Sequence, residues 1–339
     1  MRWPLASSSS SELSENYSRS EPAAPQADLY APDALAPYDG PITRTGAMTR
    51  GTADSVAAYA FDTVSFGPHW EVTGGLRWDR FAIDYEQVAT TGVRTPYART
   101  DSMVSGRGGV IFKPRAEGSI YLGYGTSFNP SAEGLSLNTS TVDLEPEKTR
   151  NYELGTKWDL LGQQLSATAA VFRTEKSNAR TPGVNPGDPP TVLAGRQRVS
   201  GVEFGISGRL RRWWTALANY AHMRSAIERS NNPDELDNSL AMVPSHTISI
   251  WTTVDLPHGV TAGGGAQFMD RVFSNASNAR QVPSYWLLNA VVTYAVNSHL
   301  SLRLNGTNLA DERYVDRVGG GHFIPGPGRQ VMLTATVRR

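Results

Sequence analysis

The sequence has no cysteine, no surplus of charge and no long apolar run. The absence of Cys excludes a disulfide framework and thiol chemistry. The 32 basic and 32 acidic residues cancel, whereas nucleic-acid binding needs a basic excess, so no nucleic-acid partner is predicted. No segment approaches the ~18 consecutive apolar residues of a transmembrane helix. Membrane β-strands are still allowed, because each needs only roughly ten residues of alternating polarity.

The N-terminal region lacks both a secretion signal and a strand pattern. Met1–Ala6 leads directly into five consecutive serines, without the apolar core of ~7–15 residues that a signal peptide requires. Residues 1–47 are rich in Ser, Pro, Ala and Asp, a composition typical of irregular chain. We therefore predict an irregular segment over 1–47 and a β-domain over 48–339.

Alternating polarity dominates the rest of the chain. Near the C-terminus, Leu300, Leu302 and Leu304 share one face of a predicted strand, and Ser301 and Arg303 share the other. The same period of two predicts thirteen strands, over 49–65, 69–84, 102–113, 118–128, 149–160, 163–175, 196–210, 213–225, 245–256, 259–273, 284–296, 299–308 and 329–339. The fold class predicted is all-β and antiparallel.

Aromatic residues lie near the two ends of several apolar faces. Pairs of this kind are Trp70 with Trp78, Tyr152 with Trp158, and Trp286 with Tyr294. Rings at both ends of an apolar stripe are typical of a lipid-facing strand, since aromatic side chains favour the headgroup levels. The competing interpretation is a soluble β-sandwich with ordinary core aromatics.

The connections between the predicted strands alternate in length. Short ones, such as Phe66–Pro68 and Leu161–Gly162, are followed by long ones over 85–101, 129–148, 176–195, 226–244, 274–283 and 309–328. Outer-membrane barrels have short periplasmic turns and long extracellular loops, so this alternation favours a transmembrane up-and-down barrel over the sandwich. Residues 1–47 would then begin on the extracellular side. Thirteen is odd, which implies either a miscount by one or an upstream part outside this chain.

No catalytic signature stands out, so we predict no enzyme, no cofactor and no metal site. The six His residues are scattered, and Gly319–Gly321 lacks the strand-then-helix context of a phosphate-binding loop. Charges on the polar strand faces would point into a wet lumen and pair with each other or with a plug. These are Glu71, Arg77, Asp79, Arg107, Glu153, Lys157, Asp159, Glu203, Arg209 and Arg303.

Contacts to a substrate, if any, are expected from the long loops. Arginines and aromatic rings there suit an anionic, aromatic ligand. The candidates are Arg94, Tyr97, Arg99, Arg180, Arg196, Arg313, Tyr314, Arg317, His322 and Phe323. The alternative interpretation is that they are ordinary solvated loop residues.

The C-terminal motif resembles that of TonB-dependent outer-membrane receptors. Asn308-Leu309-Ala310-Asp311 followed by Tyr314, a Gly/Pro-rich loop and Pro327-Gly328-Arg329 is similar to the end of their barrels. Leu144-Glu145-Pro146-Glu147 and the residues up to Gly155 are similar to another barrel segment of the family. The motif sequences are most similar to those of ferric-siderophore receptors of the catecholate type, and the resemblance covers residues 48 to the end.

The resemblance implies a transporter in the bacterial outer membrane. Family members have a 22-stranded barrel plugged by an N-terminal domain that TonB contacts. No plug or TonB box has a counterpart in this sequence, and Arg339 stands where the family has a terminal aromatic residue that the barrel-assembly machinery reads. We therefore expect the C-terminal ~13 strands of such a barrel. Its expected partners are a ferric siderophore, outer-membrane lipid, the assembly machinery, and TonB through a missing plug. A passive porin-like channel and a non-functional remnant are the alternatives.

Overall fold

The computed structural model describes residues 5–21, 33, 35, 40–130, 132, 134–139, 141–181, 192–319 and 322–338. Among these residues the helical elements are two short 3₁₀ turns, η1 (Pro233–Glu235) and η2 (Pro257–Gly259). No helix in the described part of the chain is both long and apolar enough to cross a membrane. The architecture is therefore carried by strands.

A single 14-stranded antiparallel sheet forms the body of the molecule. Its strands follow chain order and are β1 (Leu5–Ser20), β2 (Thr43–Phe66), β3 (Trp70–Val88), β4 (Arg94–Arg115), β5 (Gly118–Asn129), β6 (Glu147–Leu160), β7 (Leu165–Thr181), β8 (Val192–Arg211), β9 (Trp214–Arg229), β10 (His246–Leu256), β11 (Val260–Met269), β14 (Tyr285–Ala295), β15 (Leu300–Thr307) and β18 (Gln330–Val337). Each strand pairs with its neighbours along the chain, so the sheet is an up-and-down meander.

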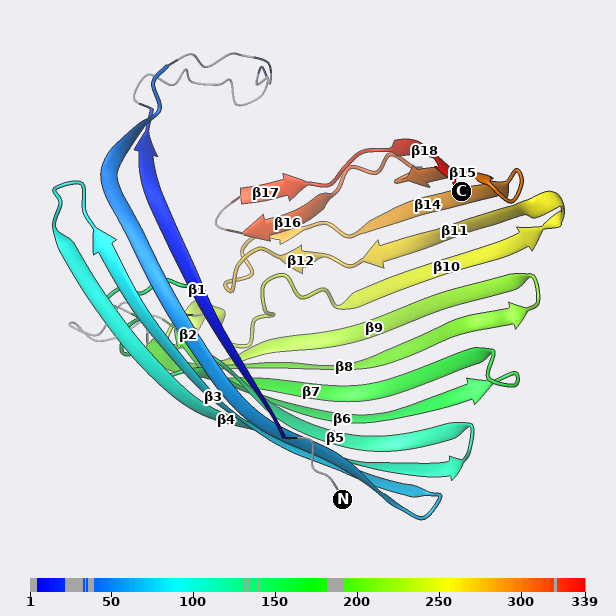
Figure 1. Ribbon diagram of the computed structural model, residues 1–339, viewed down its shortest axis with the longest axis horizontal. Coiled ribbons are helices and arrows are strands. Elements are labelled where there is room, and N and C mark those ends of the chain that lie inside the picture. Colours follow the sequence, from blue (N-terminus) through cyan, green and yellow to red (C-terminus); the bar gives the residue numbers. More distant parts are fainter. Residues whose placement is uncertain are drawn as a thin grey trace.

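Two small hairpins lie outside this sheet. One joins β12 (Val272–Phe273) to β13 (Gln281–Val282), and the other joins β16 (Val315–Gly319) to β17 (His322–Pro325). The β16–β17 hairpin and β13 lie in connections predicted as loops, whereas β12 lies at the end of the strand predicted over 259–273. In Figure 1 they project from the ends of β11, β14 and β15 opposite the tight turns.

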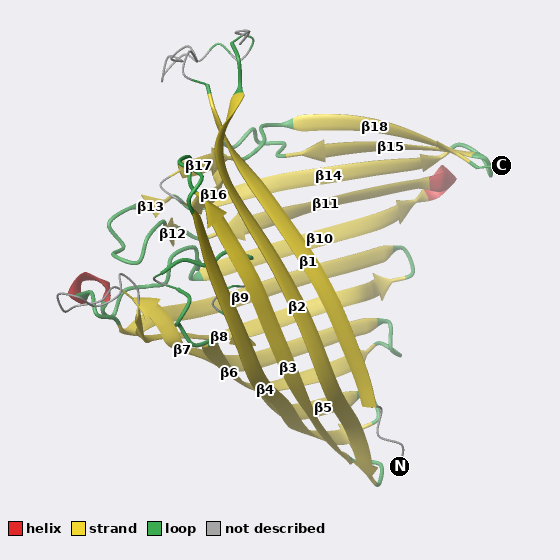
Figure 2. Cartoon of the chain, turned by 60° about the vertical axis from the view of Figure 1, so that its left-hand side comes forward, coloured by secondary structure: helices red, strands yellow, loops and turns green. Residues whose placement is uncertain are grey.

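The sheet curves strongly around one axis. Figure 1 shows β1 and β18 at its two free edges, and Figure 2 shows β1–β5 crossing in front of the remaining strands. In the described residues β1 pairs only with β2, and β18 only with β15. The short turns lie together at one end, hereafter the short-turn end, and the long connections lie at the other, hereafter the long-loop end.

The prediction of an irregular segment over 1–47 is wrong for Leu5–Ser20. This segment forms β1, which pairs antiparallel with β2 from Leu5 opposite Ala60 to Ser20 opposite Thr43. Serine runs favour turns over strands, and only Leu5, Leu13 and Tyr17 mark the outward face, so the local pattern conceals the strand. Fourteen strands replace the predicted thirteen, because β1 was not predicted.

The long-loop end also differs from the prediction at one connection. Residues 85–101 were expected to be a loop, but β3 continues to Val88 and β4 begins at Arg94, which leaves a short turn between them. The backbone pairs without interruption from Trp70 opposite Phe112 to Val88 opposite Arg94. Strands this long exceed the roughly ten residues that cross a bilayer, so their ends extend beyond it.

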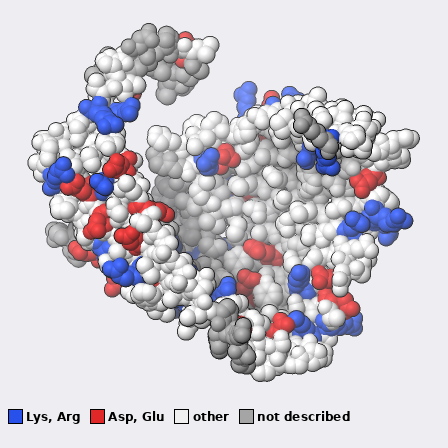
Figure 3. All heavy atoms as spheres, viewed as in Figure 1, with Lys and Arg blue, Asp and Glu red and all other residues white. Residues whose placement is uncertain are grey.

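The two faces of the sheet have opposite character. Large apolar residues on the convex face stay exposed, for example Leu76 (68%), Leu122 (59%) and Leu333 (68%). The concave face is hollowed and carries acidic and basic groups side by side (Figure 3). A monomer in water rarely exposes so continuous an apolar surface, whereas a lipid-facing barrel wall requires it.

Candidate functional site

The predicted lumen charges lie on the concave face, because strand pairing keeps their side opposite the exposed apolar residues. Four of them, Glu71, Arg77, Asp79 and Glu153, have a close partner. The guanidinium of Arg77 donates to Asp79, with Nη2 and Oδ1 2.7 Å apart, and Lys113 Nζ lies 2.5 Å from Glu71 Oε1. The hydroxyl of Tyr121 donates to Glu153 Oε1 at 2.6 Å. Mutual pairing supports the expectation that these charges stabilise the wall.

The remaining inward charges are more open. Arg107 lies over the ring of Phe61, with 4.0 Å between the guanidinium carbon and the ring centroid. The others are at least partly exposed, which fits a wet interior: Lys157, Asp159, Glu203, Arg209 and Arg303. Their roles toward a substrate or plug stay a prediction.

At the long-loop end, the connection between β5 and β6 folds inward against the concave face. This inner loop comprises the described residues of 130–146. Leu137 is 1% exposed and packs with Ala53, Ile83 and Tyr85 from β2 and β3. Burying such a leucine contributes about 2 kcal/mol. The inner loop therefore rests on the wall at the mouth of the curved sheet.

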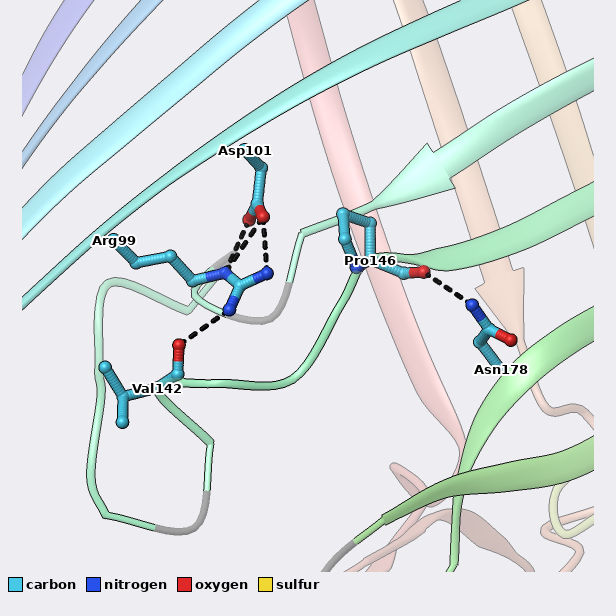
Figure 4. Close-up of polar contacts among 5 residues, drawn as sticks. All are labelled: Arg99, Asp101, Val142, Pro146 and Asn178. Carbon is cyan, nitrogen blue, oxygen red and sulfur yellow. Dashed lines mark hydrogen bonds and ion pairs between the residues drawn. The ribbon is translucent and has the colours of Figure 1, made fainter.

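Arg99 and Asp101 of β4 hold the inner loop in place (Figure 4). Arg99 Nη2 lies 2.6 Å from Asp101 Oδ1, and Arg99 Nη1 donates to the carbonyl oxygen of Val142 at 2.6 Å. The side chain of Asp101 is only 4% exposed and that of Arg99 14%. Nearby, Asn178 donates to the carbonyl of Pro146 at 3.5 Å. A guanidinium whose charge is matched this way has little left for a ligand.

The other predicted loop arginines are dispersed. Arg94 pairs with Glu86 at 2.9 Å, and Arg317 pairs with Asp316 at 3.2 Å. Arg196 is exposed on β8, and Arg180 lies near the end of β7. Arg313 is exposed in the connection after β15, while Tyr97 packs beside the inner-loop cluster. The structure thus does not bring the ten candidates together as one site.

Two of the candidates do meet in a cleft. His322 and Phe323, at the start of β17, line a cavity of about 560 Å³ between the two small hairpins, which we call the rim cleft. Val282, Val315 and Val318 give it an apolar wall, and Arg280 adds an exposed cation. Its size lies within the range of ~300–1,000 Å³ that is usual for small-molecule sites.

Arg280 was missed by the sequence reasoning. It belongs to a long predicted loop, 274–283, like the arginines that were selected, so the same signal could have found it. The carbonyl of Arg280 accepts from the amide of Ser274 at 3.0 Å, which fixes the backbone of this turn. No acidic side chain among the described residues pairs with its guanidinium, so the cation is available to an anionic ligand.

The C-terminal motif builds the base of the β16–β17 connection. Asn308 is 4% exposed, and its amide donates to the carbonyls of Glu312 and Pro327 at 2.9 and 3.1 Å. Asp311 Oδ1 accepts from the amide of Arg329 at 2.9 Å. Hydrogen bonds therefore join the two separated parts of the motif, residues 308–312 and 327–329, at the base of the connection.

Tyr314 fixes the rim connection against the wall. Its ring lies 4.6 Å from that of Tyr285, centroid to centroid, and a Cβ at Gly326 would overlap it. Burial, followed by the nearby Asp316 charge, raises the pKa of Tyr314 above its usual value.

The histidines are less scattered than predicted. His222 and His246 face each other across β9 and β10, with ring centroids 4.5 Å apart. Within the described part of the chain, no group of three or more His, Cys, Asp or Glu residues could hold a metal ion.

An antiparallel sheet with an apolar convex face and a charged concave face is the wall of a membrane β-barrel, and the rim cleft lies among its long connections. The chain belongs to the family described as TonB dependent receptor-like, beta-barrel, whose profile matches residues 6–309. This confirms the family resemblance and the fold class inferred from the sequence.

Several known proteins are similar. A probable TonB-dependent receptor, BfrD of Bordetella pertussis, is 33% identical over 328 residues, covering 91% of this chain and 44% of its own. The probable siderophore receptor PiuA of Acinetobacter baumannii is 32% identical, covering 85% and 41%. The crystal structure of the ferric-catecholate import receptor Fiu of Escherichia coli K12 superposes with a TM-score of 0.85 at 25% identity, covering 98% and 52%. The chain thus spans less than half the length of these curated relatives.

Proposed function

We propose that this chain forms part of the wall and the long-loop end of an outer-membrane receptor for ferric siderophores. Relatives that match most of the chain carry the names siderophore receptor and catecholate siderophore receptor. The observation that carries the proposal is the rim cleft, where Arg280, His322 and Phe323 meet in a cavity of about 560 Å³. An anionic, aromatic iron chelate suits a cation beside an aromatic ring.

The family suggests separate roles for the barrel wall, the plug domain and TonB. Iron would arrive already chelated, so the ion is cargo and the protein needs no metal ligands of its own. The wall would capture the chelate at the long-loop end and offer a charged lumen for its passage. Energised uptake would come from TonB acting on a plug domain. Insertion would involve outer-membrane lipid and the barrel-assembly machinery.

The rim cleft gives the test of capture. The refolded chain in detergent micelles would be titrated with a ferric tris-catecholate, following quenching of Trp fluorescence. We expect Arg280→Gln to weaken binding about tenfold, because it removes one charge-assisted contact. Arg271→Gln is the matched control, since Arg271 is exposed in the same connection but does not line the cleft. Equal binding by both variants, or none by the parent chain, would contradict the proposal.

A passive porin-like channel is the competing function. The matching relatives are named receptors, which favours capture over free diffusion. Liposomes containing the refolded chain separate the two functions. Solute-driven swelling at porin-like rates without any affinity for ferric chelates would support the channel instead.

A further inference from the structure

Two histidines oppose each other on the convex face, one on β9 and one on β10. His222 and His246 are directly paired in the sheet, which leaves their imidazole centroids 4.5 Å apart at an interplanar angle of 29°. The backbone hydrogen bond is made by their neighbours, from the amide of Met223 to the carbonyl of Ser245 at 2.9 Å. The pair without backbone hydrogen bonds of its own is the one whose side chains approach most closely in an antiparallel ladder. We call His222 and His246 the histidine pair.

The histidine pair lies at the edge of the apolar band of the convex face. Two positions further along each strand toward the short turns, Tyr220 opposes Ile248, which opposes Phe268 on β11. The ring of Phe268 lies 4.9 Å from that of Trp286, and exposed Ile250 continues the apolar band beyond this row. A row of aromatic rings marks the level at which the hydrocarbon of a bilayer gives way to headgroups. The histidine pair stands on the long-loop side of the row and is only partly buried, so dissolved ions can reach it.

Both rings of the histidine pair are anchored through the same nitrogen. Nδ1 of His222 lies 3.1 Å from the carbonyl oxygen of Ser245, which can only accept, so this nitrogen carries the proton. Nδ1 of His246 lies 3.0 Å from the hydroxyl oxygen of Tyr220, which accepts in the same way when Nδ1 is the protonated nitrogen. Each Nε2 then keeps its lone pair. Metal-binding histidines have this arrangement, because one nitrogen binds the ion while the other donates to an oxygen that orients the ring.

We propose that the histidine pair binds a divalent ion of the late first-row metals, such as Zn²⁺ or Cu²⁺, through its two Nε2 atoms. Imidazole nitrogen suits these ions, whereas Mg²⁺ and Ca²⁺ prefer oxygen ligands. Within the described part of the chain no third His, Cys, Asp or Glu completes a group around the pair, so water fills the remaining positions of the ion. The site lies on the convex face and goes beyond the proposed uptake of iron, which arrives already chelated.

The separation of the two rings suits one shared ion. Two Zn–N bonds of ~2.0–2.1 Å span at most about 4.2 Å, which is close to the 4.5 Å between the ring centroids. The rings tilt open about their Cβ–Cγ bonds to aim both Nε2 atoms at the ion. The bound ion then joins β9 to β10 at the level where both strands leave the apolar band.

The experiment compares metal binding by two matched double variants. The pair variant is His222→Gln/His246→Gln, and the control variant His258→Gln/His299→Gln removes the same number of imidazoles from the short-turn end. Each refolded, metal-free chain in micelles of a nonionic detergent would be titrated with ZnCl₂ by calorimetry. We expect the pair variant to lose about tenfold or more in affinity for Zn²⁺, because both ligands are gone, and the control to stay within about twofold.

Single substitutions test whether the two rings share one ion. His222→Gln and His246→Gln should each lose most of the affinity that the pair variant loses, since one imidazole alone makes a single bond to the ion. With Cu²⁺ in place of Zn²⁺, electron paramagnetic resonance of the parent chain should show coupling to two imidazole nitrogens. Full affinity in either single variant, or coupling to one nitrogen, would overturn the proposal.

A gain of affinity guards against a folding defect in these variants. Arg224 is exposed two residues further along β9 on the same face, and its charge repels a metal ion. Arg224→Gln is therefore expected to tighten Zn²⁺ binding about twofold. No gain in this variant, equal losses in the pair and control variants, or displacement of Zn²⁺ by a hundredfold excess of Mg²⁺ would each place the ion elsewhere.

Unfolding gives a second readout that does not depend on uptake. An ion that binds only the folded chain raises its stability, so Zn²⁺ should raise the urea midpoint of the parent and control chains and leave that of the pair variant unchanged. Neither histidine of the pair lines the rim cleft. The pair variant should therefore keep the parent affinity for a ferric tris-catecholate, which separates failure of this proposal from failure of the proposed function.

Discussion

At the scale of single residues, the decisive contacts are few and buried. Arg99 was a candidate for binding substrate because it lies in the predicted long loop 85–101 and carries a positive charge. In the structure that charge is matched by Asp101, and the guanidinium also holds the Val142 carbonyl of the inner loop. The residue type was read correctly as an anion-binding group, but its anion is supplied by the same strand.

Replacing Arg99 by Gln would leave the Asp101 carboxylate buried without its partner. We expect a loss of roughly 3 kcal/mol in the free energy of unfolding, since breaking one side of a buried ion pair strands the other charge. Urea unfolding of the refolded chain in micelles, followed by Trp fluorescence, measures it.

Arg94→Gln is the control for this prediction, because Arg94 lies on the same strand and its pair with Glu86 is largely exposed. It should cost about 1 kcal/mol or less. Equal destabilisation by the two substitutions would show that the Arg99–Asp101 pair does not hold the inner loop.

At the scale of elements, the inner loop depends on a close approach to β2. A Cβ at Gly51 would lie 2.8 Å from the carbonyl oxygen of Leu135 and 3.2 Å from the Tyr85 ring. The absence of a side chain at this position lets the loop pack down onto the wall. A glycine inside a strand often marks such an approach.

Gly51→Val should therefore detach the inner loop while leaving the strands paired. We expect chymotrypsin to cut at Leu137 at least several times faster, and overpacking to cost about 1–3 kcal/mol. Gly74→Val serves as control, because a Cβ there would meet nothing within 4 Å. An unchanged cleavage rate would mean that the loop does not need this contact.

At the scale of the whole molecule, the sidedness of the sheet governs how it meets the membrane. The middle of the convex face can be apolar because lipid replaces water there, and the concave face can be charged because it stays wet. This division also explains why the exposed leucines of the convex face are no liability in a bilayer.

Leu122→Arg would place a cation on the lipid side of β5. We expect a cost of about 2–4 kcal/mol near the bilayer centre, seen as a smaller folded fraction in vesicles on a heat-modifiability gel. Ser207→Arg puts the same group on the concave face of β8 and should be tolerated. Should both variants fold alike, the convex face would not be the lipid-facing one.

The alternating strands and their order were determined by the sequence alone. Side chains such as Leu300, Leu302 and Leu304 alternate because a strand sends neighbours to opposite faces, and this rule needs no distant contact. The family motif around Asn308 was also visible locally, although its role in tying the rim together was not.

Only the tertiary structure decided the features that depend on pairing between distant segments. β1 has a serine-rich sequence with weak strand preference, and its backbone hydrogen bonds to β2 make it a strand. The inner loop turns inward because Leu137 finds an apolar surface on β2 and β3. Arg280 meets His322 and Phe323 because two hairpins far apart in the chain fold side by side. Periodicity reports which face a residue occupies, whereas partners across the sheet are fixed by the folded arrangement.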